Sequence, residues 1–215
     1  RILICLGILS VAGIPFASEI YAFIASPLLD ILPAGSSMIA TQVTSPFMAP
    51  LKLVLFSALL LTMPYLFYEL WMFISPGLYK NEKSFVAPLM ISTIFLFSAG
   101  VAFAYLVVLP IIFTFFIGVA PESIQVMTDI NQYLSFVIKL IFAFGIAFEI
   151  PVATFLLIRT GIVKKESLIK ARPYLIILFF VIGMLLTPPD IFSQLFLAIP
   201  MWLLFEVGLV VSKKN

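Results

Sequence analysis

Residues 84–121 form a run of 38 amino acids without a single charged side chain. This run is longer than the about 20 residues that an α-helix needs to cross the roughly 30 Å hydrocarbon core of a membrane. The whole chain is similar, because 63% of its 215 residues are hydrophobic and only 10% are charged. A soluble surface needs roughly 25–35% charged residues. The chain is therefore predicted to be a polytopic membrane protein, neither soluble nor disordered.

Six apolar stretches are long enough, or nearly long enough, to be read as transmembrane helices in one transmembrane domain that spans residues 1–215. The 38-residue run is interpreted as one long, kinked or extended helix, because two spans would leave no room for a connection. The uncharged parts of the last two spans are short, which predicts a hairpin that thins the membrane or docks partner helices. The predicted spans are approximately residues 2–22, 48–74, 85–117, 133–157, 173–187 and 192–211.

The basic residues indicate the orientation of these spans. Ten of the twelve lysine and arginine residues fall on one side of the predicted topology, in the two termini and in the loops around 80–83 and 159–172. The opposite loops carry Asp30, Glu122, Asp129 and Asp190 and no basic residue. Because basic loops stay in the cytoplasm, both termini are predicted to be cytoplasmic, which requires an even number of spans.

The composition excludes several classes of site. The chain has no histidine and one cysteine, so histidine-ligated haem, a Ser-His-Asp triad and an intrachain disulfide are excluded. No phosphate-binding P-loop motif is present, and a net charge of +2 does not favour nucleic acid as a partner. No metal, cofactor or catalytic residue is predicted, and we expect no enzyme.

Glu149 is the most informative single residue. It lies about halfway along the fourth span, in the otherwise uncharged run 141–157. A carboxylate at this depth is costly and normally faces protein or a water-filled cavity. The functional interpretation is an intramembrane polar site that contacts a substrate or partner helix. The alternative is a protonated glutamate bonded to a neighbouring helix.

Longer motifs resemble the TatC family, the multispanning subunit of the twin-arginine protein translocase. The resemblance covers essentially the whole chain, and its motifs are long and ordered. They are Met38-Ile39-Ala40-Thr41 with Ser45-Pro46-Phe47, the segment Tyr68 to Tyr79 with Glu82, the segment Phe142 to Pro151, Arg172-Pro173-Tyr174, and Leu186 to Asp190 with Ser193-Gln194.

The resemblance implies a glove-shaped bundle of six kinked helices in the bacterial inner membrane. It also implies a receptor for signal peptides with two consecutive arginines, which self-associates in a receptor complex. The single-span partners would be TatA and TatB, and folded proteins would be exported with the proton motive force.

The resemblance also assigns residues. Glu82 matches the position that binds the twin arginines, and Phe73 matches an aromatic position of the same recognition surface. The chain is expected to lack a preceding cytoplasmic segment that carries a further acidic contact, with Arg1 as its last basic residue. The positions at which the family docks its single-span partners correspond to Met184, Thr187 and Gln194 in this sequence. Positions in the family's outer loops correspond to Pro27 and Asp190.

Two other classes of protein were weighed. An ion-coupled secondary transporter that uses Glu149 would be expected to show repeated halves and several intramembrane charges. An integral-membrane enzyme would need a clustered nucleophile and base or metal ligands. One central acid without a repeat favours the translocase subunit, with the transporter as the alternative.

Overall fold

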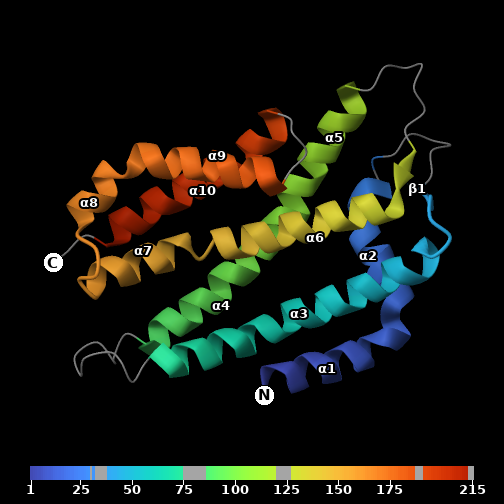
Figure 1. Cartoon of the computed structure of the whole chain (residues 1–215), viewed down its shortest axis with the longest axis horizontal. Helices are drawn as coiled ribbons and strands as arrows, with labels where there is room; N and C mark the ends of the chain where they lie inside the picture. Colours follow the sequence, from blue (N-terminus) through green and yellow to red (C-terminus); the bar gives the residue numbers. More distant parts are fainter. Residues whose placement is uncertain (30, 32–37, 75–85, 120–126, 187–190, 213–215) are drawn as a thin grey trace. The chain divides into compact units, whose positions relative to one another are not determined.

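The computed structural model describes residues 1–29, 31, 38–74, 86–119, 127–186 and 191–212. Nearly all of these residues are helical, which confirms the all-α membrane class (Figure 1). Two short strands, β1 (Met38–Ile39) and β2 (Thr128–Asp129), were not predicted. The helices are α1 (Ile2–Gly13), α2 (Ala17–Leu29), α3 (Ser45–Ile74), α4 (Val86–Phe103), α5 (Leu109–Val119), α6 (Ile130–Ala147), α7 (Ile150–Arg159), α8 (Lys165–Lys170), α9 (Arg172–Leu186) and α10 (Ile191–Val211).

Within the described residues, five helical stretches are long and apolar enough to cross a membrane. The remaining predicted span, the fifth in the chain, corresponds to α9, an apolar helix of only 15 residues. The neighbouring α10 has 21 residues because the helix continues past Glu206. The predicted short hairpin is therefore short in α9, but α10 has full spanning length. The five long stretches are Ile2–Leu29, Ser45–Ile74, Val86–Val119, Ile130–Arg159 and Ile191–Val211.

The first span is longer than predicted and is bent. A 3₁₀ turn, Ile14–Phe16, separates α1 from α2 and contains Pro15, which has no N–H group to continue the α-helix. The helix then runs to Leu29, so Pro27 lies buried inside α2 and not in the first outer loop as expected. The ring of Pro27 leaves the Phe23 carbonyl without its usual partner, and the hydroxyls of Ser26 and Tyr105 donate to this carbonyl instead.

Within the 38-residue run, the described residues Val86–Val119 form one long helical stretch, as predicted. It contains a π-helical turn, Ala104–Val108, between α4 and α5. Pro110 lies two residues after this turn and has no N–H group to bind the Leu106 carbonyl. π-Helical turns commonly accompany a local disturbance of this kind in the hydrogen-bond ladder. The fourth span has a comparable break at Phe148–Glu149, between α6 and α7, just before Pro151.

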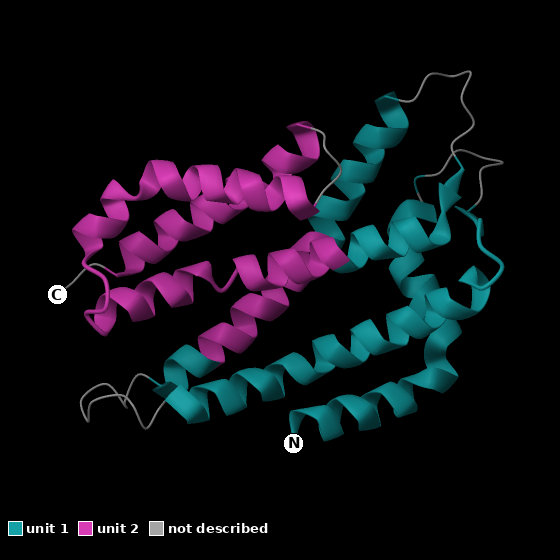
Figure 2. Cartoon of the chain, viewed as in Figure 1, with its two compact units in different colours: residues 1–90, 105–138 teal, residues 91–104, 139–215 magenta. Residues whose placement is uncertain are grey.

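The chain divides into two compact units, coloured separately in Figure 2. Unit 1 comprises residues 1–90 and 105–138, and unit 2 comprises residues 91–104 and 139–215. In unit 1, α1 and α2 pack on α3, and α2 also contacts α5. In unit 2, α10 packs against both α7 and α9.

The outer end of unit 1 is held by a group of hydrogen bonds that we name the outer clasp (Thr41, Ser45, Asp129 and Asn131). The parallel pair β1–β2 brings Ile39 opposite Asp129. The Asp129 carboxylate accepts hydrogen bonds from the Thr41 hydroxyl at 2.6 Å and the Thr41 N–H at 3.1 Å. Asn131 donates to the Ser45 hydroxyl at the start of α3. The clasp therefore joins the segment before α3 to the start of α6.

Asp129 also stabilises the first turn of α6, because its second carboxylate oxygen accepts the Gln132 N–H at 3.0 Å. These donors, the Thr41 hydroxyl first among them, hold the pKa of the Asp129 carboxyl below its usual value. Below the clasp, the buried Tyr133 of α6 donates to the Ile24 carbonyl of α2 at 2.9 Å.

Unit 2 depends on close approach between helices and on one ion pair. Gly208 of α10 lies where an added Cβ would be 2.9 Å from the Pro151 Cα of α7. Gly100 of α4 lies where an added Cβ would be 2.5 Å from the Phe144 carbonyl oxygen. At the cytoplasmic end, Arg172 of α9 binds Glu206 of α10 at 2.6 Å.

Candidate functional site

Glu149 lies at the break between α6 and α7, where the backbone leaves the regular helix. Its N–H binds the Ile146 carbonyl three residues earlier, and its carbonyl accepts the Ala153 N–H at the start of α7. This local path follows from Pro151, which has no N–H group for the Ala147 carbonyl. The break therefore places a carboxylate at a point where the helix cannot continue its hydrogen-bond ladder.

The carboxyl group of Glu149 faces α4 within unit 2. The Thr93 side chain and the Phe97 backbone hydrogen bond to it. The other carboxylate oxygen, Oε1, is buried and has no hydrogen-bond partner among the described residues. A buried acceptor without a partner is costly, which makes Glu149 a candidate for an intramembrane polar site.

Aromatic rings enclose the Glu149 region inside unit 2. Phe103 of α4 packs on Phe144 and Phe148, with ring centroids 5.6 Å apart in both pairs. Thr93 is also buried, with 4% of its surface exposed. The setting is an apolar interior with one acid and one hydroxyl, and sequence reasoning identified the acid but missed Thr93. Threonines are common in membrane helices, and the sequence gives no register between α4 and the α6–α7 break.

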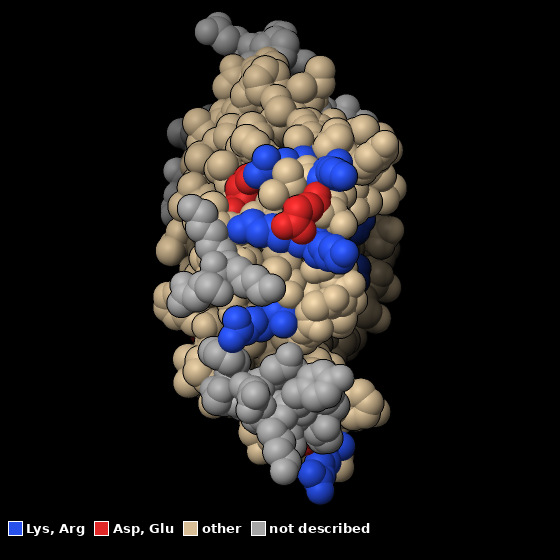
Figure 3. Space-filling view, turned by 90° about the vertical axis from the view of Figure 1, so that its left-hand side faces the viewer, with Lys and Arg blue, Asp and Glu red and all other residues tan. Residues whose placement is uncertain are grey.

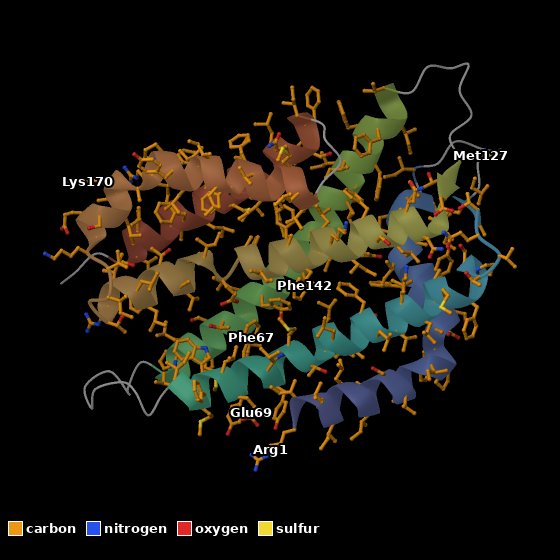
Figure 4. The ribbon with its side chains drawn as sticks, viewed as in Figure 1. Arg1, Phe67, Glu69, Met127, Phe142 and Lys170 are labelled. Atoms are coloured by element: carbon orange, nitrogen blue, oxygen red, sulfur yellow. The ribbon has the colours of Figure 1, made fainter. Side chains whose placement is uncertain are left out.

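Phe73 lies in the last turn of α3, and 84% of its surface is exposed. Glu82, its predicted partner in recognition, falls outside the described residues. Arg1 precedes α1 and is exposed, and Figure 4 shows it at the same end of unit 1 as Glu69 of α3. Glu69 accepts a hydrogen bond from the Tyr65 hydroxyl at 2.6 Å, one helical turn away, so this acid has a local partner.

The predicted partner-docking residues differ in their surroundings. Met184 is 52% exposed on α9. The Gln194 side chain of α10 is engaged within unit 2, because its Nε2 donates to the Phe180 carbonyl at 2.8 Å. Thr187 and Asp190 fall outside the described residues. Among the described residues, no group of three His, Cys, Asp or Glu side chains is placed to hold a metal ion.

Glu206 of α10 is paired with Arg172 of α9 at 2.6 Å. The outer clasp was missed by sequence reasoning. The only signal for it was the position of Asp129 directly before an amphipathic run, which is typical of a helix N-cap.

Comparison with known proteins gives a consistent result over the full chain. The family model described as "Sec-independent protein translocase protein (TatC)" matches residues 1–200. The TatC protein of Azotobacter chroococcum is 59% identical over 193 residues, which cover 90% of this chain and 76% of the relative. The TatC protein of Escherichia coli K12 is 52% identical over 198 residues, covering 92% of this chain and 77% of the relative.

Solved structures agree with the sequence comparison. A crystal structure titled "Twin Arginine Translocase Receptor- TatC" has a TM-score of 0.88 at 34% identity and covers 99% of this chain and 93% of that one. A second structure, in DDM, has a TM-score of 0.90 at 33% identity, covering 99% and 95%. The relatives are bacterial and are named as translocase components, not as enzymes. The chain therefore belongs to the TatC family of Sec-independent protein translocase proteins, as a non-enzymatic, multi-pass protein of the bacterial inner membrane.

Proposed function

We propose that the chain is the signal-peptide receptor and core subunit of the twin-arginine translocase. The observation that carries this proposal is the exposed ring of Phe73 at the end of α3, in a chain of the TatC family. The segment that follows α3 contains Glu82. An exposed aromatic ring that is followed in the sequence by an acidic residue suits a peptide with guanidinium groups, because arginine pairs with carboxylates and stacks on rings.

The hydrophobic part of the signal peptide requires an apolar environment with few polar groups. The surroundings of Glu149 in unit 2 fit this requirement, since they contain buried aromatic rings and one carboxylate oxygen that has no hydrogen-bond partner in the described part of the chain. In this proposal Glu149 receives a donor from the inserted peptide or from a partner helix. The alternative of an ion-coupled transporter is not favoured, because the chain belongs to a translocase family.

TatA and TatB are proposed to dock on the apolar surface of α9 near Met184, and further copies of the chain to join the receptor complex. The exposed side chains of α9 are apolar, and Gln194 already binds the Phe180 carbonyl. Docking at this surface therefore relies on packing around Met184, and Gln194 supports the α9–α10 pair. Export of folded cargo would use the proton motive force.

The receptor role is tested with Glu82→Ala. Loss of a charge-assisted hydrogen bond should weaken binding of a twin-arginine peptide at least about tenfold. Binding of a peptide with two glutamines in place of the arginines should change little. The measurement is photocrosslinking from position 73 with peptide titration. Glu166→Ala removes an exposed acid on the cytoplasmic side and serves as the matched control; equal affinity of wild type and Glu82→Ala would contradict the proposal.

The role of the intramembrane acid is tested separately with Glu149→Gln. This variant keeps the size of the side chain, so the twin-arginine peptide should still bind at the cytoplasmic side. Export of a folded reporter should fall by at least about tenfold, because one charge-assisted contact contributes roughly that much. Full export by Glu149→Gln would show that this acid has only a structural role.

A further inference from the structure

Five basic side chains gather within 14 residues of unit 2, in a segment that we name the α8 basic segment (residues 159–172). It contains one acid, Glu166. The face drawn in Figure 3 shows lysine and arginine side chains grouped around a smaller number of acidic ones. The basic residues of this segment are Arg159, Lys164, Lys165, Lys170 and Arg172.

Two of these five side chains have a structural role inside unit 2. Lys165 donates through Nζ to the Leu209 carbonyl in the last turn of α10, where carbonyl groups lack helical partners. Arg172 binds Glu206, and 43% of its side chain is exposed. Both contacts hold the segment against α10 and fix its position at the cytoplasmic end of the unit.

Lys164 and Lys170 are different, because both are exposed and neither has a partner among the residues that the structure describes. Lys164 caps the start of α8 and Lys170 is its last residue. Figure 4 labels Lys170 at the end of α8. The unit thus presents two exposed lysines, one at each end of α8.

Apolar side chains are exposed beside these lysines. Ile162 is 72% exposed, Ile169 is 39% exposed, and Tyr174 at the start of α9 is 74% exposed. Exposed lysines, isoleucines and a tyrosine within one short stretch of chain, residues 162–174, are typical of the membrane–water interface, where apolar groups enter the acyl boundary and cations remain at the headgroups.

The position of the segment in the chain supports a lipid partner over a soluble one. It joins α7, which ends a transmembrane stretch, to α9, which begins the next apolar helix. Both of its ends are therefore at the membrane surface. A soluble acidic protein would pair with the lysines but would leave Ile162 and Ile169 in water.

We propose that the α8 basic segment binds the headgroups of anionic phospholipids in the cytoplasmic leaflet, through Lys164 and Lys170. This inference goes beyond the proposed receptor function. Its consequence concerns α9, which has 15 residues and spans only about 22 Å. Anchoring of α8 at the headgroups fixes the cytoplasmic end of α9 at the membrane surface. The difference between the length of α9 and the roughly 30 Å hydrocarbon core must then lie at the outer end of this helix.

The test uses the full chain reconstituted in phosphatidylcholine vesicles, with spin-labelled phosphatidylglycerol or phosphatidylcholine as probes. The fraction of motionally restricted label gives the relative association of each lipid. Wild type should prefer phosphatidylglycerol at least about threefold, since each lysine near a membrane attracts anionic lipid. The Lys164→Gln/Lys170→Gln variant should lose most of this preference, whereas Lys164→Arg/Lys170→Arg should keep it.

The matched control is Lys52→Gln/Lys139→Gln, which removes two exposed lysines outside the segment. An equal loss in both glutamine variants would overturn the proposal, because it would indicate a general effect of charge. So would a wild type without lipid preference, or binding of a soluble polyglutamate peptide in place of the lipid. If circular dichroism shows that the glutamine variant does not fold, the test relies on the wild type alone. The preference of the wild type for phosphatidylglycerol must then fall as the salt concentration rises.

Discussion

The two units solve the same problem, holding helices together in lipid, by different means. Unit 1 joins its elements through side-chain hydrogen bonds at the outer end, centred on Asp129. Unit 2 joins its helices through glycines that bring backbones close together, with an ion pair at the cytoplasmic end. Lipid is as apolar as the side chains, so burial of apolar surface alone does little to select one helix arrangement.

The difference indicates which contacts can be broken in each unit. Hydrogen bonds between a loop and a helix start break singly and re-form with water at the membrane surface. Close backbone contacts inside the membrane have no such substitute. We therefore expect the outer clasp of unit 1 to respond to pH and the glycine contacts of unit 2 to respond to side-chain size.

The largest effect is expected for Gly100→Ala in unit 2. The added Cβ would lie 2.5 Å from the backbone oxygen of Phe144, which has little freedom to move. Overpacking of this kind costs about 2–3 kcal/mol, which lowers the unfolding temperature by about 4–12 °C for a chain of this size. The measurement is thermal unfolding in detergent, followed by tryptophan fluorescence.

The control for this prediction lies in unit 1. Apart from the backbone of α1 itself, no atom of the described residues lies within 4 Å of a Cβ added at Gly7 of α1. Gly7→Ala should therefore be neutral or stabilise by up to about 1 kcal/mol through the higher helix propensity of alanine. Similar losses for Gly100→Ala and Gly7→Ala would remove the distinction between the two units.

An intermediate effect is expected for Asp129→Asn in the outer clasp, with a loss of about 2–4 °C in unfolding temperature at neutral pH. The lowered native pKa of Asp129 means that its contribution is complete above the ordinary aspartate pKa of about 4. The contribution is lost as the pH falls through the lower native value. Wild type should thus approach the variant in strongly acidic buffer, and parallel curves from pH 7 to pH 3 would contradict the role of the carboxylate.

The smallest effect is expected for Arg172→Gln at the ion pair of unit 2. Because 43% of the Arg172 side chain and 25% of the Glu206 side chain are exposed, solvent screens the pair. The expected loss is about 0.5–1 kcal/mol, and it should shrink in high salt. Glu206→Gln provides the reciprocal control and should give a loss of stability of similar size. A loss of stability that stays constant in high salt would show that the pair contributes through packing and not through charge.

The spans and the all-α class were predictable because apolar length and the distribution of charge act over many residues. The position of Pro27 was not, because a proline near a helix end reads equally well as a loop. It lies inside α2, where the hydroxyls of Ser26 and of Tyr105 both donate to the Phe23 carbonyl. The Tyr105 contact joins residues 82 apart, so it depends on tertiary structure and leaves no local pattern.

The candidate site was predictable to a similar degree. Glu149 is visible in the sequence, since a lone acid in an apolar run has a clear cost. Thr93 is not, because its role depends on which face of α4 meets the α6–α7 break. The outer clasp was missed for the same reason: Thr41 and Asp129 are 88 residues apart, and strands of two residues have too few side chains to show an alternating pattern.

The boundaries between the two units fall inside helical segments and not in loops. The chain passes from one unit to the other within α4 after Met90, within the π-helical turn after Ala104, and within α6 after Ile138. A protease that cuts exposed loops therefore has no site at which to separate them. Neither unit could be excised as an independent fragment, and insertion of a flexible linker at any of these three junctions would have to break a helix first.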